Sequence, residues 1–444
     1  MKTLFPKLIC LALFLLLAAL LIPIGNTFLV QLDTFATVTM QEIRSRDDIE
    51  LALVGSSIVQ HHFNAPLISE ATGLTAFDVT ITNAYLPDDL ALTRQLYETN
   101  NPEWVVLVLE SYSFNWIRTD PQSQLKLMPH LTSPLNRARY YRDIIETDGD
   151  RLGRLLLFNT FGFSSLGDVR KAARLRMDPD GVLAQLIAES DGQYAYEDGF
   201  VRRESTERAM DRLVKTVIRE ESDYEYKVYD YTKEKLLEYK ALVESHGSRL
   251  LVVLAPGMTA HVLAEPSYLA YLDDAQVFFD QIGVPCVNLT LARPELLPNL
   301  DEYYFDLYHM VGEGADLLSA AFARVFNALR AGEDVSGLFY RDSGEYLAAI
   351  DFITNVWMTQ EDAGDGRVTL RADCNRGSQV TPEYRFTLRG ADGSETLLRD
   401  YDAEPAFVCD ASLLAGGAPR VYARVQGETD AVFFDPGDEE CPLP

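Results

Sequence analysis

Between positions 50 and 330, the hydrophobic residues fall into short apolar runs separated by segments of helical spacing. Mostly apolar runs of this length are typical of strands buried on both faces of a sheet. The five runs are 50–54, 76–81, 104–109, 249–254 and 284–289. The segments between them carry helix signals, such as Pro87-Asp88-Asp89 at a start and Gly73 or Gly247 at an end. This alternation predicts an α/β fold with a parallel sheet.

A different hydrophobic pattern occupies the first residues. Lys2 and Lys7 lead into a continuous apolar run over residues 8–24, about the length that crosses a bilayer. No Ala-x-Ala cleavage site follows, so we expect a retained signal anchor over residues 1–30. The cationic end should stay cytoplasmic, which places the bulk of the chain on the extracytoplasmic side of the cell membrane. Residues 28–48 are expected to continue as a helix or stalk.

Beyond Gly332 the pattern changes to an alternation with period two. Short alternating strands with turns such as Ala391-Asp392-Gly393 predict a β-sandwich of immunoglobulin-like type over residues 333–444. Cys374 and Cys409 fall on expected strands outside the membrane, and a disulfide between them is one hypothesis.

The α/β segment, residues 31–332, is interrupted between about 118 and 223 by a stretch that reads as helices and loops. Its first half is basic and contains an apolar patch over residues 155–163. Two interpretations are open. The insertion covers the sheet with a solvated cationic face, or it presents a surface to membrane headgroups, an anionic polymer or a membrane partner.

Composition narrows the function classes. The 444 residues carry a net charge of −28, which argues against nucleic acid as a partner. The length predicts two or more domains, and 47% hydrophobic residues are enough for a sizeable core. Five cysteines are too few for a disulfide scaffold. No cofactor is expected.

Two short motifs carry candidate chemistry. Gly55-Ser56-Ser57 follows the first expected strand and opens a helix, so it presents a hydroxyl at the carboxyl edge of the sheet. Asp306 and His309 lie three positions apart just before the last helix of the same segment. A serine early in the chain, with an aspartate and a histidine late, can assemble a Ser–His–Asp triad.

Together these motifs resemble the SGNH/GDSL hydrolase superfamily, over about residues 1–330. The segment from Gly55 to Val79 is most similar to the membrane-anchored branch of that superfamily. That branch includes DltD-like proteins of teichoic acid D-alanylation and extracytoplasmic acetyltransferases of alginate and related polysaccharides. The resemblance implies a flavodoxin-like parallel sheet.

By position, the resemblance makes Ser57 the nucleophile, His309 the general base and Asp306 the carboxylate that orients it. Ser56 stands where the family has the aspartate of Gly-Asp-Ser. The family's oxyanion glycine and asparagine are both missing from the segments after the second and third strands. Asn83 and Ser111 are the candidates to replace these donors.

Two alternatives concern the same helix. Ser57 could serve only as a helix cap. His61 and His62 could be an alternative base or a metal pair. Adjacent helical residues do not share a face, and we expect no metal site.

The expected function is therefore extracytoplasmic O-acyl transfer. Ser57 would take an acyl group, most simply acetyl, and pass it to a hydroxyl of a polysaccharide or teichoic-acid-like acceptor. In the resembling branch the acyl group arrives through a polytopic membrane-bound O-acyltransferase, the expected partner here. The alternatives are a free-standing carbohydrate or lipid esterase, and a non-catalytic polysaccharide-binding or assembly subunit.

Overall fold

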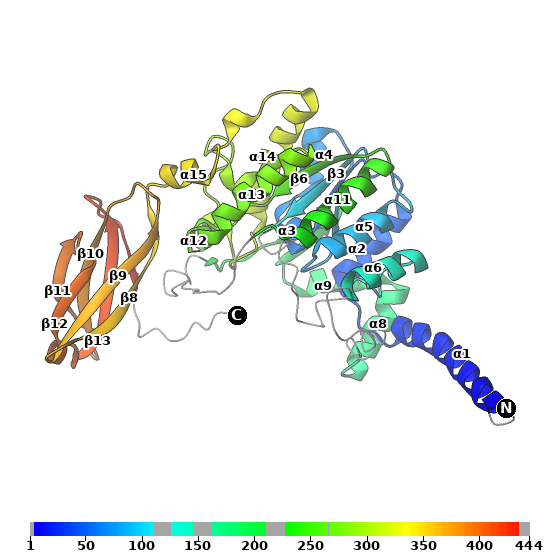
Figure 1. The fold of residues 1–444 in the computed structure, drawn as a ribbon, viewed down its shortest axis with the longest axis horizontal. Coiled ribbons are helices and arrows are strands. Elements are labelled where there is room, and N and C mark those ends of the chain that lie inside the picture. Colours follow the sequence, from blue (N-terminus) through cyan, green and yellow to red (C-terminus); the bar gives the residue numbers. More distant parts are fainter. Residues whose placement is uncertain (1–3, 111–125, 146–161, 210–226, 265, 435–444) are drawn as a thin grey trace. The chain divides into compact units, whose positions relative to one another are not determined.

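A five-stranded parallel sheet is the centre of the α/β part of the chain (Figure 1). The computed structural model describes all residues except 1–3, 111–125, 146–161, 210–226, 265 and 435–444. The strands are β1 (Leu51–Gly55), β2 (Ala76–Thr80), β3 (Trp104–Leu109), β6 (Arg249–Leu254) and β7 (Cys286–Asn288). Their spatial order is β2-β1-β3-β6-β7, which is the flavodoxin-like order with its topological switch point between β1 and β3.

The described chain divides into two compact units, residues 1–204 with 228–253 and residues 205–227 with 254–444. The helices of the first are α1 (Leu4–Phe28), α2 (Thr34–Ser45), α3 (Ser57–His62), α4 (Ala65–Thr72), α5 (Leu86–Leu96), α6 (Pro134–Ile145), α8 (Leu166–Met177), α9 (Pro179–Glu189) and α11 (Asp230–Ser245). Those of the second are α12 (Thr259–Ala264), α13 (Pro266–Ile282), α14 (Gly312–Ala331), α15 (Ser343–Ala349) and α16 (Ala411–Leu414). The domain boundary at residue 332 stays a prediction.

Helix α1 contains the apolar segment expected to cross a membrane. In the described part of the chain, Lys7–Asn26 is the segment long and apolar enough to do so, and only 6% of it is buried. A signal sequence has the same length and composition, so membrane anchoring stays a prediction.

Helix α2 corrects the expectation of a stalk. Its residues Val38, Met40 and Ile43 are at most 1% exposed. Glu42 accepts a hydrogen bond from Tyr196, and Gln41 donates one to Asp180 on α9. The chain therefore enters the folded head, which is the part of the first unit after α1, within a few residues of the end of α1.

The basic insertion is helical where it is described, and it also holds a hairpin, β4 (Tyr194–Glu197) and β5 (Phe200–Arg203). The turn residues Asp198 and Gly199 both have positive φ, as a two-residue type I′ hairpin requires. Buried Asp143 on α6 lies 3.1 Å from the Lys235 amine and 3.5 Å from the Arg94 guanidinium. These ion pairs hold the insertion against α11 and α5.

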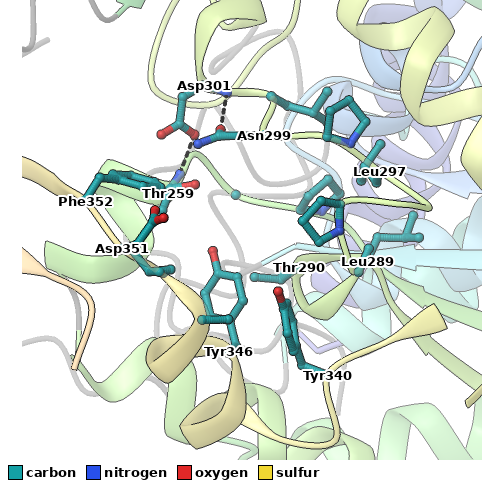
Figure 2. Close-up of a pocket in the computed structure, with 18 residues that line it drawn as sticks. Thr259, Leu289, Thr290, Leu297, Asn299, Asp301, Tyr340, Tyr346, Asp351 and Phe352 are labelled. Atoms are coloured by element: carbon teal, nitrogen blue, oxygen red, sulfur yellow. Dashed lines mark hydrogen bonds between the residues drawn. The ribbon is translucent and has the colours of Figure 1, made fainter. Parts of the chain in front are cut away.

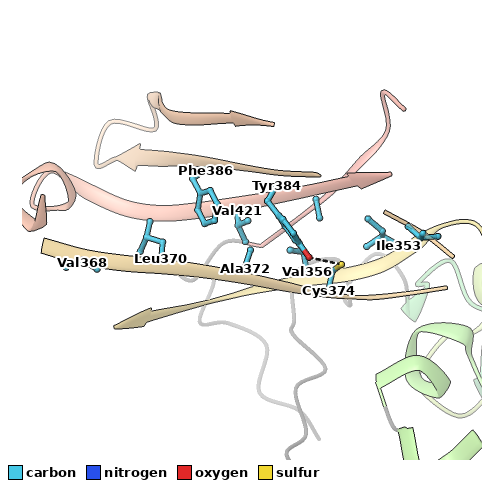
Figure 3. Packing of buried hydrophobic residues seen from close by; sticks show 11 residues of the cluster. Ile353, Val356, Val368, Leu370, Ala372, Cys374, Tyr384, Phe386 and Val421 are labelled. Atoms are coloured by element: carbon cyan, nitrogen blue, oxygen red, sulfur yellow. Dashed lines mark hydrogen bonds between the residues drawn. The ribbon is translucent and has the colours of Figure 1, made fainter. Parts of the chain in front are cut away.

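The C-terminal part consists of two antiparallel sheets packed face to face, which confirms the predicted antiparallel strands (Figure 3); the immunoglobulin-like type stays a prediction. One sheet has the order β11-β10-β13-β14 and the other β12-β9-β8. The strands are β8 (Ile353–Gly364), β9 (Arg367–Arg376), β10 (Pro382–Gly390), β11 (Glu395–Asp402), β12 (Ala406–Asp410), β13 (Gly417–Val425) and β14 (Ala431–Phe434). Leu370, Phe386 and Val421 are fully buried between the two sheets.

The disulfide hypothesis is wrong in this structure, since Cys374 and Cys409 are both free thiols. Cys409 on β12 pairs in register with Val368 on β9. Cys374 lies further along β9, six residues away, or about 20 Å in a strand. Its sulfur contacts the Tyr384 hydroxyl at 3.3 Å instead.

Strand β2 carries a buried carboxyl. Asp78 is 0% exposed, and neither of its carboxyl oxygens has a hydrogen-bond partner among the described residues. Burial, and next the charge of Asp198, raise the pKa of Asp78 well above its usual range. The additional cost of ionising the buried Asp78 is therefore absent below the unfolded-state pKa of about 4, and it grows as the pH rises from there to the folded-state pKa.

We therefore expect Asp78→Val to raise the free energy of unfolding at pH 7 by about 1–3 kcal/mol, because it removes an unpartnered buried polar group. The difference from the wild type should shrink toward pH 4. Thermal unfolding of the full-length protein in detergent across this pH range measures it. Asp191→Asn, a change at an exposed acid, is the control. A less stable Asp78→Val variant would show that the carboxyl has a stabilising partner.

Candidate active site

The turn from β1 into α3 places Ser57 at the carboxyl edge of the sheet, at the switch point of the strand order. Ser56, not Ser57, is the N-cap of α3, and its hydroxyl accepts a hydrogen bond from the Ile58 N–H at 3.1 Å. Ser57 is the first residue of the helix and is 5% exposed. The capping alternative for Ser57 is therefore wrong, because its neighbour caps the helix.

Gly55 makes this turn sterically possible. A Cβ atom at this position would lie 2.7 Å from Cγ2 of Val59 and 2.9 Å from the carbonyl oxygen of Val108. The chain thus leaves β1 so close to β3 that only glycine fits without displacement.

Asp306 and His309 form a hydrogen-bonded pair in the second unit. The His309 Nδ1 atom lies 3.0 Å from both carboxylate oxygens of Asp306. A carboxylate only accepts hydrogen bonds, so Nδ1 carries the proton and Nε2 is the basic nitrogen. The Asp306 Oδ1 atom also accepts the backbone N–H groups of Tyr308 and His309, each at 2.8 Å.

These contacts keep Asp306 ionised. Burial acts to raise the pKa of Asp306, but the hydrogen bond and charge of His309, with the two backbone N–H groups, outweigh it. The net pKa lies below the usual value of an aspartate. An ionised aspartate can fix the tautomer of the imidazole and stabilise its protonated form.

Backbone hydrogen bonds close the loop that carries this pair. Phe305 N–H donates to the His309 carbonyl at 3.0 Å, and Val311 N–H donates to the Tyr303 carbonyl at 2.8 Å. The Phe305 ring stacks on the imidazole of His309, with ring centroids 5.7 Å apart. The loop therefore fixes the orientation of the imidazole from its backbone and from one ring face.

Of the two oxyanion candidates, the structure describes Asn83 and does not describe Ser111. Asn83 follows β2 and has a φ of 51°, a left-handed conformation that glycine adopts most easily and that asparagine tolerates. The role of Asn83 as an oxyanion donor stays a prediction. Ser111 lies outside the described residues. Its neighbour Glu110 follows β3 and is half-buried.

His61 has a structural partner that accounts for it. Its Nδ1 atom lies 2.8 Å from the Val201 carbonyl oxygen on β5, and this contact ties α3 to the hairpin. Among the residues that the structure describes, no group of three or more His, Cys, Asp or Glu side chains could hold a metal ion.

The prediction from sequence missed a second histidine near the Asp306–His309 loop. His261 on α12 is 8% exposed, and its ring meets the Tyr308 ring edge-on at 5.9 Å. Neither ring nitrogen has a hydrogen-bond partner in the described part of the chain. Burial lowers the pKa of His261, so the ring is neutral at pH 7. The available signal was a histidine shortly after the apolar run at 249–254.

A cavity of about 280 Å³ lies at the carboxyl ends of β6 and β7 (Figure 2). It is bounded by residues of α15 and of the segment 289–301. Its polar groups largely satisfy one another: Thr259 N–H donates to Asp301 at 2.7 Å, and Asp301 N–H donates to Asn299 at 2.9 Å. Since its lining holds no Lys, Arg or His, the cavity does not suit an anionic ligand, and it contains neither Asp306 nor His309.

Comparisons with known proteins give distant likenesses. The chain matches no protein-family model and no curated protein. Among solved structures it is similar to a protein assigned as an acylhydrolase from Bacteroides fragilis, with 12% identity, a TM-score of 0.28 and coverage of 69% of this chain and 93% of that one. It is also similar to a GDSL-like lipase from Bacteroides thetaiotaomicron, with 12% identity, a TM-score of 0.28 and coverage of 66% and 99%. Likenesses this distant carry no argument about activity, which rests on the residues described above.

The close approach at Gly55 gives a testable stability effect. Gly55→Ala should lower the free energy of unfolding by about 1–3 kcal/mol, because the added methyl group overlaps a backbone oxygen that cannot rotate away. Gly337→Ala is the matched control, since no atom lies within 4 Å of its added Cβ. Chemical unfolding in detergent measures both. Equal stability of the two variants would contradict the steric role of Gly55.

Proposed function

We propose that this protein is a membrane-anchored, extracytoplasmic O-acyltransferase of SGNH type, with Ser57 as nucleophile, His309 as general base and Asp306 as orienting carboxylate. The observation that supports it best is the Asp306–His309 pair. Its tautomer leaves Nε2 as the basic nitrogen, the arrangement that a nucleophilic serine requires. A serine at the switch point of a flavodoxin-like sheet supports it further.

The proposed reaction has two halves. The Ser57 hydroxyl attacks the carbonyl carbon of an acyl donor while His309 Nε2 takes its proton. The tetrahedral intermediate collapses, the proton passes to the leaving group, and an acyl ester remains on Ser57. An acceptor hydroxyl then attacks this ester, His309 takes the acceptor's proton and returns it to Ser57, and the acylated acceptor leaves.

Stabilisation of the oxyanion is the weak point of this site. In the proposal the Ser57 N–H and Asn83 are the donors, with Ser111 as a further candidate. One donor fewer costs on the order of 100-fold or more in rate. A membrane-bound O-acyltransferase that delivers the acyl group directly to Ser57 can offset this through orientation and effective concentration. The proposed acceptor is a hydroxyl of a polysaccharide or a teichoic-acid-like polymer.

The triad assignment predicts that Ser57→Ala and His309→Ala each abolish labelling by an active-site phosphonate and reduce polymer acylation on the order of 10³-fold or more. Asp306→Asn should impair acylation strongly by losing the tautomer control. The matched control is Ser56→Ala, which removes the helix cap at about 1 kcal/mol of stability but leaves the nucleophile in place. Phosphonate labelling in membranes, followed by peptide mapping, locates the labelled residue in each variant. Polymer acylation is measured in the same membranes.

Three outcomes of this experiment separate the candidate functions. Labelling on Ser57 together with polymer acylation supports the acyltransferase. Labelling without any acyl transfer would support an esterase. Absence of labelling in a folded wild-type protein would contradict catalysis at Ser57 and support the binding or assembly subunit.

Dependence on a partner predicts slow hydrolysis by the protein alone. The full-length protein in proteoliposomes without any partner should hydrolyse a soluble acetyl ester with a kcat/KM well below about 10⁴ M⁻¹s⁻¹. Co-reconstitution with a polytopic acyltransferase should raise transfer to the polymer and leave hydrolysis low. A value of about 10⁴ M⁻¹s⁻¹ or more for the protein alone would replace this proposal by a free-standing esterase.

A further inference from the structure

Helix α8 (Leu166–Met177) has an exposed surface that neither the fold nor the proposed reaction uses. Ala172 and Leu175 are at most 2% exposed and attach the helix to the head. Leu166, Val169 and Met177 are 77%, 40% and 78% exposed. Their spacing of three to four residues, continued by exposed Ala173, places them along one side of the helix. The exposed side of α8 is thus an apolar stripe.

Cations border this apolar stripe. Arg170, Lys171 and Arg174 are exposed, and no ion pair engages their side chains within the described residues. The only acid of the helix, Asp168, is used in the capping box with Ser165. A chain with a net charge of −28 therefore presents a cationic and apolar helix face at this place. This is the pattern of a helix that lies in a membrane interface.

Hydrogen bonds connect both ends of the segment 162–176 to the residues that follow α1. Val30, two residues after the end of α1, forms a β-bridge with Gly162. The Gln31 side chain donates to the Gly162 carbonyl at 3.0 Å, and the Arg176 guanidinium donates to the Val30 carbonyl at 3.2 Å. Both ends of the segment 162–176 therefore contact the residues at which the chain leaves α1.

From these observations we infer that α8 is an interfacial helix that binds anionic phospholipid headgroups at the bilayer surface crossed by α1. Arg170, Lys171 and Arg174 would contact the phosphates, and Leu166, Val169 and Met177 would enter the boundary between headgroups and acyl chains. The inference depends on α1 spanning the membrane and is independent of the chemistry at Ser57. Its consequence is that the head is held close against the membrane.

The test is hydrogen–deuterium exchange of the full-length protein in lipid nanodiscs. One set contains phosphatidylcholine alone, and the other contains about one third phosphatidylglycerol. Each cation near an anionic surface strengthens binding on the order of five-fold. We therefore expect amides of residues 166–177 to exchange at least about ten-fold more slowly in the anionic nanodiscs. The exchange of α1 itself should be slow in both sets.

Two variants and a control separate charge from apolar contact. The triple variant Arg170→Gln, Lys171→Gln, Arg174→Gln should lose the dependence on anionic lipid. The pair Leu166→Ser and Met177→Ser should reduce protection of α8 in both lipids. The control, Arg341→Gln with Arg367→Gln and Arg371→Gln, makes the same change in net charge at exposed arginines of the C-terminal part, and it should behave as the wild type.

Four results would overturn the inference. Equal exchange of α8 in both lipids would exclude headgroup binding. Protection that survives the triple variant would exclude these cations as its cause. Protection by a soluble polyanion in neutral nanodiscs, without an effect of anionic lipid, would assign the face to a polymer. Fast exchange throughout α1 would show that α1 does not span the bilayer, on which the inference depends. Ser57→Ala should leave every result unchanged, which separates this inference from the proposed reaction.

Discussion

The hydrogen bonding of β1 on both sides is the constraint on which the α/β part depends. β1 pairs in parallel with β2 on one edge and β3 on the other, and its apolar residues are 0% exposed. At its carboxyl end β1 passes directly into α3, and at this turn only glycine fits at position 55 against Val108. The turn delivers Ser57 to the switch point of the strand order, where open α/β sheets bind ligands.

The Asp306 carboxylate plays the corresponding part in the second unit. It accepts two backbone N–H groups of its own loop and the Nδ1–H of His309, so one ion sets the loop conformation and the tautomer together. The negative charge of this side chain matters chemically. A neutral side chain at 306 would keep the loop bonds in part but would not stabilise a protonated imidazole. In the proposed reaction this positioned base would work with few oxyanion donors, so delivery of the acyl group by a partner would contribute strongly to the rate.

The connection between α1 and the head is short and held by specific contacts. Buried α2 and the contacts of Val30 with Gly162 and Arg176 replace a flexible stalk by a short, bonded connection. The inferred contact of α8 with headgroups would restrict the head further. Under the proposed function, a head with little freedom relative to the bilayer would meet a membrane-borne acyl donor at high effective concentration, and orientation would then contribute most to the rate.

Local pattern determined much of this from the sequence alone: the apolar runs that became β3 and β6 at the predicted ends, the period-two alternation of the C-terminal part, and the Asp306–His309 spacing that closes one loop. These features depend on interactions between residues close in the chain, and such interactions can be predicted from the sequence. Only the tertiary structure decided that Ser56 is the cap and Ser57 is not, and that Cys374 and Cys409 lie too far apart along β9 and β12 to bond. It also decided that the buried Asp78 carboxyl has no hydrogen-bond partner among the described residues. It also brought His261 against Tyr308 and α8 against the end of α1. Each of these results depends on register or packing between segments distant in sequence, which periodicity and propensity do not encode.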